Sequence, residues 1–455
     1  MTLAPSSLGW VLAAAVAVPL SGWADPPQPE AQDGGSQTAT RKRDVPDYDG
    51  RGAEPPTPTE QALEVPRGIL APAYLVGEYL VRRPLGAATV WADQHHVPKT
   101  LYDFFTFGPD HQAGIAPVAF LDLGSNPDFG VYAFWNGAGG KGNDVRAHAE
   151  MWDTHWLAAS VTDEFHSDMG VLMLKGSAQR RPDHTFFGLG PESSQANTSR
   201  YGEDFIDGSL HAGLFGWRSS SLRMGVGIRR ESLYDGHFGT DPGTAEAAAA
   251  GAFDLPVGFG SAFTAAYEDL SLVIDTRPRG TSGTGARVEA SAELGEQPQA
   301  VYGWERWGAT AGVFYDLNGY SRVLSLSVAT TATAPVGNAA IPFTELVSVG
   351  GNDTMRGFYV GRLVDRSGAV ATLRYRWPVW MWLDGTAEAA VGNVFPSYLK
   401  GFDTSMLRFS GTIGLETPQT ASGAFMLLVG FGTETFAQGA KVESLRLVLG
   451  TNHGF

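Results

Sequence analysis

A glycine-rich segment carries the most distinctive group of side chains in this sequence: Gly350, Gly351, Arg356, Gly357 and Phe358. Two adjacent glycines permit a sharp reversal of the backbone, and Gly357 allows the chain to pass closely against a wall. The guanidinium of Arg356 is a rigid fork of donors, which is costly to enclose unless a carboxylate faces it. The segment is therefore either an ordinary surface loop with a solvated arginine, or a loop that enters a confined space and binds an acid there.

Motifs of catalysis and cofactor binding are missing from the sequence. There is no Gly-x-Ser-x-Gly elbow, no His-Glu-x-x-His pair and no glycine-rich phosphate loop. His95 and His96 are adjacent without a spaced third ligand, which is typical of a polar surface. Cys is absent, and the net charge of -16 argues against nucleic acid as a partner. We expect no enzyme activity, no cofactor, no metal and no nucleic-acid partner.

Strands with one apolar face make up most of the chain from about residue 113 onward. In residues 221–229, apolar side chains alternate with Arg and Gly, which is the period-two pattern of a strand that buries one face. The same alternation recurs at 286–295, 321–329 and 406–416. Such strands fit either a transmembrane barrel, where the apolar face contacts lipid, or a soluble β-sandwich.

Aromatic residues beside the shortest turns favour lipid over a sandwich core. Rings gathered at one level are typical of the girdle at a membrane interface. They are Trp377, Trp380 and Trp382 around Pro378, Tyr315 and Tyr320 around Asn318-Gly319, and Trp217 before Ser219. The chain also ends on an aromatic residue, Phe455. Since unpaired strand edges are not tolerated in hydrocarbon, the strands must close into a barrel.

The fold class predicted from these patterns is all-β, a transmembrane antiparallel β-barrel of about sixteen strands. The candidate strands lie near 113–123, 128–138, 144–154, 155–164, 170–180, 204–217, 220–232, 261–277, 285–296, 303–317, 320–333, 369–379, 381–395, 405–416, 423–435 and 441–455. The three longest connections, 181–203, 233–260 and 334–368, all follow odd-numbered strands. They therefore emerge at one end of the barrel, which we expect to be the extracellular end.

The sequence before the barrel (residues 113–455) divides into three expected segments. Residues 1–24 contain an apolar run, Trp10 to Leu20, and small residues before Asp25, which is typical of a signal peptide. Residues 25–66 are rich in Pro, Gly and charge, so we expect a disordered tether. Residues 67–112 predict a short helical segment, packed at the periplasmic mouth or in the lumen, with the membrane surface as the lesser alternative.

Several short motifs resemble the bacterial surface antigen superfamily, which includes outer-membrane barrel-assembly and translocation proteins and two-partner secretion transporters. The strong resemblance covers roughly residues 340 to 455. Its motifs are Pro342-Phe343, Gly350-Gly351, Arg356-Gly357-Phe358, Arg376-Trp377-Pro378, 391–395 (VGNVF), 407–415 (LRFSGTIGL) and Phe455. A weaker resemblance, in 186–190 (FFGLG) and 275–277 (DTR), is to members that lack periplasmic repeats. Residues 25–66 are shorter than one such repeat and have the wrong composition for it, so we expect a member that lacks periplasmic repeats.

The resemblance implies a sixteen-stranded barrel in the bacterial outer membrane whose sixth extracellular loop folds into the lumen. The motif arginine of that loop, here Arg356, contacts acidic residues of the inner wall. Phe455 corresponds to the terminal aromatic that serves as an insertion signal. The sequence departs from the family pattern at two wall positions, because Ala390 stands where an Asp is usual and Arg374 where a Glu is usual.

Three carboxylates on the inward phase are candidate partners of Arg356. We rank Glu388 and Glu416 above Asp384, because Asp384 adjoins a short periplasmic turn while the loop enters from the other end. Arg374, Arg376 and Arg408 lie nearby on the same phase and compete for these acids.

The resemblance implies assembly or translocation, in which a weak seam between the first and last strands opens laterally and the luminal loop steadies the wall. The expected partners are outer-membrane lipid and an unfolded outer-membrane or secreted protein, or a lipid, as substrate. The alternative is a passive channel or structural barrel that the loop plugs.

Overall fold

The computed structural model describes residues 94–278, 283–298, 301–380, 383–417 and 424–452, with positions 83, 87, 90 and 91 before them. The expected signal peptide, the expected tether and Phe455 lie outside the described residues, as does most of the sequence from 67 to 93. No helix in the described ranges is long and apolar enough to cross a membrane.

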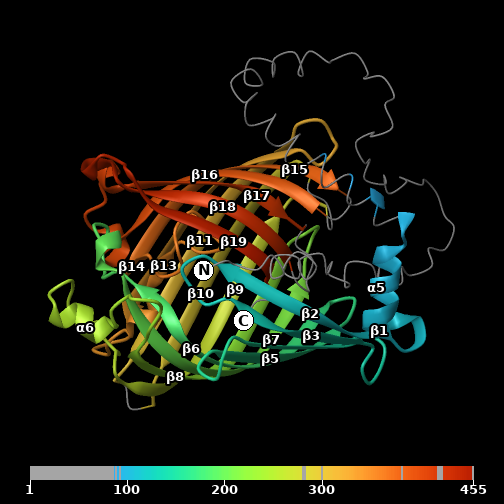
Figure 1. Ribbon diagram of the computed structural model, residues 1–455, viewed down its shortest axis with the longest axis horizontal. Coiled ribbons are helices and arrows are strands. Elements are labelled where there is room, and N and C mark those ends of the chain that lie inside the picture. The colour runs from blue at the N-terminus through green and yellow to red at the C-terminus, as the bar shows by residue number, and fades with distance from the viewer. Residues whose placement is uncertain are drawn as a thin grey trace, which may run out of the picture.

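Sixteen antiparallel strands close into a barrel (Figure 1). They are β2 (Ala113–Asp122), β3 (Asp128–Asn136), β4 (Asn143–Met151), β5 (Leu157–His166), β6 (Gly170–Phe186), β7 (Ser199–Phe215), β8 (Ser221–Asp235), β9 (Ala262–Asp275), β10 (Gly285–Glu296), β11 (Gly303–Asp316), β12 (Val323–Pro335), β15 (Ser367–Trp380), β16 (Leu383–Phe395), β17 (Arg408–Glu416), β18 (Ala424–Thr435) and β19 (Val442–Asn452). Each pairs with the next in sequence, and β19 pairs with β2 to close the ring. The predicted all-β barrel of sixteen strands is confirmed.

The outer face of the barrel is apolar because alternate side chains of each strand point outward, as the period-two pattern predicted. Val226 and Ile228 of β8 are exposed on the outer face, whereas the next residue, Arg229, points inward and donates to the carboxylate of Glu345 in the luminal loop. Exposed rings gather near the short turns, as at Trp135, Trp217 and Tyr315. An apolar belt bordered by aromatic residues is the surface that a bilayer covers.

The two ends of the barrel differ in their connections. Short turns such as 137–142, 167–169 and 216–220 lie at one end, called here the short-turn end. The connections 187–198, 236–261 and 336–366 lie at the other, the long-loop end. This arrangement follows the odd-and-even pattern that the sequence predicted.

Strand β6 is longer than expected and shortens the connection predicted at 181–203. It continues to Phe186, and β7 begins at Ser199 rather than near residue 204. The ladder between them shifts register between Arg181 and His184, on either side of Pro182. Proline has no N–H for the ladder, so a bulge here lets the strand resume pairing beyond it.

The helical elements are short. Helix α5 (Val97–Phe105) begins with Pro98 in its first turn, a position that suits proline. It leads into β1 (Thr106–Phe107), which pairs with the first two residues of β2 at the short-turn end, on the edge opposite β3. The others are α6 (Thr244–Ala249) and the 3-10 turns η3 (Pro109–His111), η4 (Gln195–Asn197), η5 (Phe343–Glu345), η6 (Ser397–Leu399), η7 (Thr404–Met406) and η8 (Phe436–Gln438).

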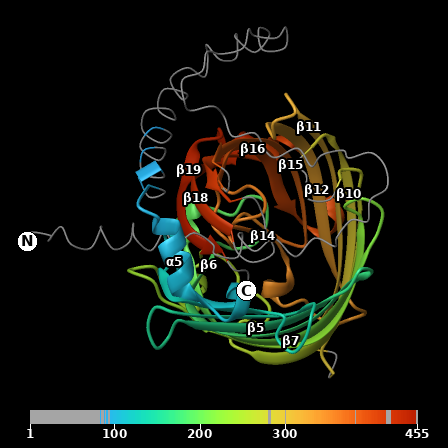
Figure 2. The same cartoon turned by 90° about the vertical axis from the view of Figure 1, so that its right-hand side faces the viewer.

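The connection from β12 to β15, residues 336–366, is called here the luminal loop. It contains the small hairpin of β13 (Val347–Val349) and β14 (Leu363–Asp365). Seen along the barrel, β14 lies within the ring of strands (Figure 2). The luminal loop therefore occupies the interior, where its apolar side chains pack against β15 and β16.

Candidate functional site: the luminal loop and the seam

The tip of the luminal loop doubles back on itself at the two adjacent glycines. Gly350 and Gly351 have φ values of 123° and 84°, a region that favours glycine. Gly351 N–H donates to the carbonyl of Phe358 at 2.9 Å, and Gly350 forms an isolated bridge with Thr354. The reversal brings Arg356 and Gly357 to the inner wall.

Gly357 lies directly against strand β18. Its N–H donates to Ser410 Oγ at 2.9 Å, and its carbonyl accepts from Ser444 Oγ at 2.9 Å. A Cβ at this position would lie 2.0 Å from the carbonyl oxygen of Phe431. Only glycine therefore allows this approach.

Two glycines of the wall form the recess that receives the loop, and sequence reasoning missed them. A Cβ at Gly430 would lie 3.0 Å from the Cα of Gly357, and one at Gly432 would lie 2.4 Å from the ring of Phe358. Both stand on the inward phase of β18. Two glycines spaced by two in a strand were the available signal, because such residues often mark the close approach of another backbone.

Arg356 is enclosed between the loop and the wall, with 4% of its surface exposed. Its Nη2 donates to Glu416 Oε2 at 3.0 Å. Glu388, which shared the first rank with Glu416, is instead bound to Arg374, whose Nε and Nη2 donate to Glu388 Oε2 at 2.8 and 2.7 Å. Arg374 and Glu388 are direct cross-strand neighbours of β15 and β16, so the competitor takes this acid.

Depth in the barrel does not separate Asp384 from Glu416, so the reason for expecting Asp384 last is wrong. Asp384 and Glu416 are register partners of β16 and β17 and therefore lie at the same level near the short-turn end. What separates them is the neighbouring arginine, since Arg376 Nε is 3.8 Å from Asp384 Oδ2. The structure thus brings Arg356 to Glu416 and leaves both Glu388 and Asp384 with arginines of β15.

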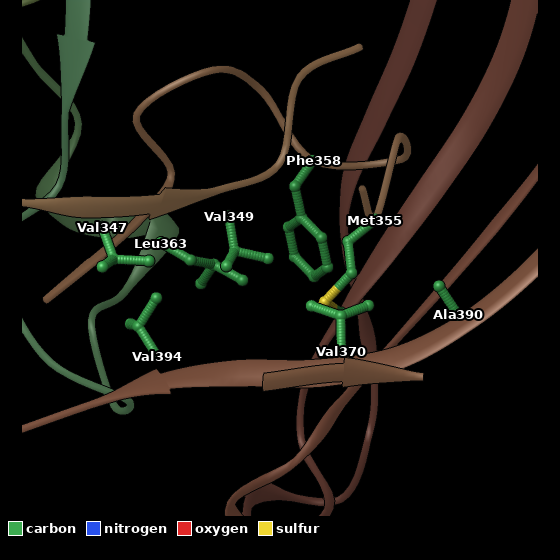
Figure 3. Close-up of a cluster of buried hydrophobic side chains, with 8 residues drawn as sticks. All are labelled: Val347, Val349, Met355, Phe358, Leu363, Val370, Ala390 and Val394. Carbon is green, nitrogen blue, oxygen red and sulfur yellow. The ribbon is translucent and has the colours of Figure 1, made fainter. Parts of the chain in front are cut away.

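An apolar contact replaces the acid usual at position 390. Met355 and Phe358 of the loop belong to one buried cluster with Val370 and Ala390 of the wall (Figure 3). A carboxylate at 390 would be buried among these side chains, at a high cost in desolvation. The departure at Ala390 and the use of Glu416 are therefore consistent with each other.

A second contact holds the start of the luminal loop against the wall far from its tip. The carboxylate of Glu345, 2% exposed, accepts from Arg229 Nη1 of β8 at 2.7 Å and from Arg306 Nη2 of β11 at 2.8 Å. Nothing in the motif pattern indicated Glu345, because its partners are distant in sequence.

A third contact joins the luminal loop to the wall near the long-loop end. Arg362 of the loop and Arg408 of β17, both fully buried, share the carboxylate of Glu443 at 2.7 and 2.5 Å. Both also donate to the carbonyl of Ser193, at 2.8 Å each. Burial lowers the pKa of Arg362, and the charge of Glu443 opposes that effect. The connection 187–198, which contains part of the FFGLG motif, is thereby tied to the luminal loop.

The Omp85 superfamily domain matches residues 138–395. The chain belongs to the Omp85 superfamily. The match covers more than half of the sequence, and it confirms the resemblance that the short motifs indicated. This Omp85 protein is therefore a β-barrel of the bacterial outer membrane.

The solved structures that are similar to this chain have low sequence identity to it. BamA from Haemophilus ducreyi lacking POTRA domains 1-3 is 14% identical with a TM-score of 0.52, over 75% of this chain and 70% of that one. CdiB from Acinetobacter baumannii and CdiB from Escherichia coli are each 11% identical with a TM-score of 0.48, over 76% of this chain. The match spans 60% and 64% of those two chains, less than two thirds. No match was found among the curated proteins.

The seam of this Omp85 barrel, between β19 and β2, is short in its described part. Three register pairs join Val448, Leu449 and Gly450 to residues 120–122, and Leu123 N–H donates to the carbonyl of Leu447 at 3.0 Å. The N–H groups of odd-numbered residues of β2 face this edge, because alternate residues of a strand bond to opposite neighbours. Pro117 falls on the same edge and has no N–H to offer.

Proposed function

We propose that this Omp85 outer-membrane barrel inserts or transports protein or lipid through the lateral seam between β19 and β2, with the luminal loop steadying the wall. The observation that carries this proposal is the short seam. Three register pairs are described at the seam, whereas fifteen join β6 and β7. Few backbone hydrogen bonds and a proline on the same edge lower the cost of opening.

An open seam would present the backbone groups of β2 toward the bilayer. Such an edge can accept a further strand by β-augmentation, which suits an unfolded outer-membrane or secreted protein as substrate. A lipid could pass by the same opening, and outer-membrane lipid is the surrounding partner in either case.

The luminal loop contacts β17, β18 and β19, the three consecutive strands that lead up to the seam. Arg356 is bound to β17, Gly357 packs on β18, and Ser444 of β19 donates to the Gly357 carbonyl. We propose that Gly350, Gly351, Arg356, Gly357 and Phe358, with Glu416 as the acid partner, keep this wall in shape while β19 separates from β2.

A disulfide across the seam tests the proposal. The sequence has no cysteine, so Leu121→Cys with Leu449→Cys, at directly paired positions, provides the sole thiols. Purified variants in liposomes are assayed for insertion of an unfolded barrel protein and for lipid exchange between leaflets. We expect oxidation to abolish the activity and reduction to restore it.

The matched control is Ala178→Cys with Ile206→Cys, a directly paired and exposed position between β6 and β7. Oxidation of this control should leave activity unchanged. Full activity of the oxidised seam variant would reject the lateral opening, and a wild-type protein inactive in both assays would reject the insertion and transport role.

A plugged structural barrel is the second candidate, favoured by the number of buried ion pairs that fasten the luminal loop. Glu345, Arg356 and Arg362 each bind a wall residue of opposite charge. In that case the seam disulfide has no effect in either assay, and deletion of the loop tip converts the barrel into a conducting pore.

Phe455 is the proposed insertion signal. Its deletion should impair insertion into the outer membrane in cells more than folding in detergent, because its role would be recognition at the rim. Equal defects in both would reject that role.

A further inference from the structure

Arg446 lies on the inward phase of β19 and forms an ion pair across the seam. The residue is 2% exposed, and its Nε and Nη2 donate to the carboxylate of Asp122, the last residue of β2, at 3.1 and 2.6 Å. Bidentate pairs of this kind are among the stronger and more directional contacts. The seam is therefore held by a side-chain pair as well as by its few backbone bonds.

The same guanidinium also holds the tip of the luminal loop. Its Nη1 donates to the carbonyls of Gly351 and Arg356, and its Nη2 donates to Asn352 Oδ1 at 2.8 Å. All three acceptors belong to the Gly350–Phe358 segment. A second contact nearby has the same character, since Tyr359 Oη donates to the carbonyl of Leu445 at 2.7 Å.

These two sets of contacts depend on each other because one charged group serves both. If the loop tip withdraws, the guanidinium loses its loop acceptors and is held only by Asp122. If Asp122 moves away as the seam opens, a buried positive charge is left on the loop side without its counter-ion, which is costly. The closed seam and the inserted tip of the luminal loop therefore stabilise each other.

We propose that Arg446 is a positioning residue that couples the luminal loop to the seam, so that release of the loop tip weakens the closed seam. This inference rests on the proposed function, in which the seam opens. It makes the loop a controller of opening in addition to a support for the wall.

Hydrogen exchange of the full-length protein in detergent micelles tests the coupling. Arg446→Met should raise exchange of the seam amides in 113–123 and 442–452 by roughly tenfold or more, because a buried pair is lost. Amides of β6 and β7 serve as the internal reference and should not change. Arg374→Met removes a wall ion pair away from the seam and is the matched control.

Arg446→Lys separates the two halves of the contact and guards against misfolding of the Met variant. Lysine keeps a charge for Asp122 but lacks the planar fork that reaches the loop carbonyls. We expect the seam amides to stay largely protected while the loop tip becomes more sensitive to protease. An unshifted gel mobility in unheated samples identifies any variant that has not folded.

A double variant decides between coupling and simple destabilisation. Gly357→Ala displaces the loop tip and should raise seam exchange in the wild-type background. In the Arg446→Met background it should add less than about twofold, because the link from the loop tip across the seam to Asp122 is already absent, and the Ser444 and Tyr359 contacts reach β19 alone. The inference would be overturned if the two substitutions multiplied each other's effect on seam exchange in full. It would also be overturned if the seam amides of Arg446→Met exchanged like those of the wild type.

These readouts need no substrate and so are independent of the proposed function. If exchange behaves as expected but the seam disulfide leaves activity intact, the coupling stands and the transport route fails. If the disulfide blocks activity and the double variant is multiplicative, the route stands and the coupling fails.

Discussion

The pairing of β6 with β7 and the pairing of β19 with β2 both join neighbouring strands of the barrel, but they rely on different contacts. Fifteen register pairs join β6 and β7, and the described part of the seam has three. On the longer ladder, the ion pair Arg180–Asp204 is 52% and 39% exposed, so it contributes little. At the seam, the side chains of Arg446 and Asp122 are only 1% and 13% exposed.

This difference shows which of the two strand pairings a single broken contact can weaken. Many backbone bonds must break together to separate β6 from β7, and the exposed pair is dispensable. At the seam, a small number of backbone bonds is supplemented by buried side chains that also contact the loop. A contact made by side chains can be broken without unfolding the strands on either side of it.

The largest expected effect on this contrast comes from Gly357→Ala. A Cβ there meets the Phe431 carbonyl, so the loop tip must leave its recess, at a cost of about 3 kcal/mol. Limited proteolysis should cleave the luminal loop rapidly, and exchange should rise at the seam amides but not between β6 and β7.

Gly208→Ala is the control for this change, because a Cβ at Gly208 of β7 has no heavy atom within 4 Å. It should behave as wild type in both measurements. A Gly357→Ala protein whose loop stays protected would mean that the wall yields instead, and the contrast would lose its basis in the loop.

A smaller effect is expected from breaking the pair between Arg356 and Glu416. Arg356→Ala and Glu416→Gln should each reduce the free energy that holds the loop against the wall by about 2 kcal/mol. The guanidinium is enclosed, whereas the side chain of Glu416 is partly exposed to solvent. Combined, they should cost little more than either alone. Protease sensitivity of the loop measures both.

Glu388→Gln is the matched control, because Glu388 binds Arg374. It should leave the loop as resistant as wild type. Additive losses in the Arg356 and Glu416 double variant, or a loop loosened equally by Glu388→Gln, would contradict the assignment of the partner.

The alternation of apolar and polar residues, together with the aromatic residues beside the short turns, was sufficient to predict the barrel. Alternation in 221–229 and the other strands fixes which face meets lipid, and the aromatic residues mark the ends of the strands. These signals are local, since each strand shows its own two faces whatever its neighbours are. Strand ends were less certain where Pro182 interrupts β6, because a bulge allows pairing to resume beyond a proline.

The need of Arg356 for an acid was also readable from the sequence, because a confined guanidinium requires a counter-charge wherever it lies. Which acid it binds depends on distances between strands. Glu388 is taken by Arg374 only because β15 and β16 align them as register partners, and Glu416 remains available on the next strand.

The contact between Arg446 and Asp122 was decided by the tertiary structure alone. The two residues are 324 positions apart in sequence and meet because the last strand closes on the first. Ring closure and the entry of the luminal loop then place three acceptors of that loop around the same guanidinium. No local pattern carries such information, since the position of a buried ion pair depends on how distant segments are brought together.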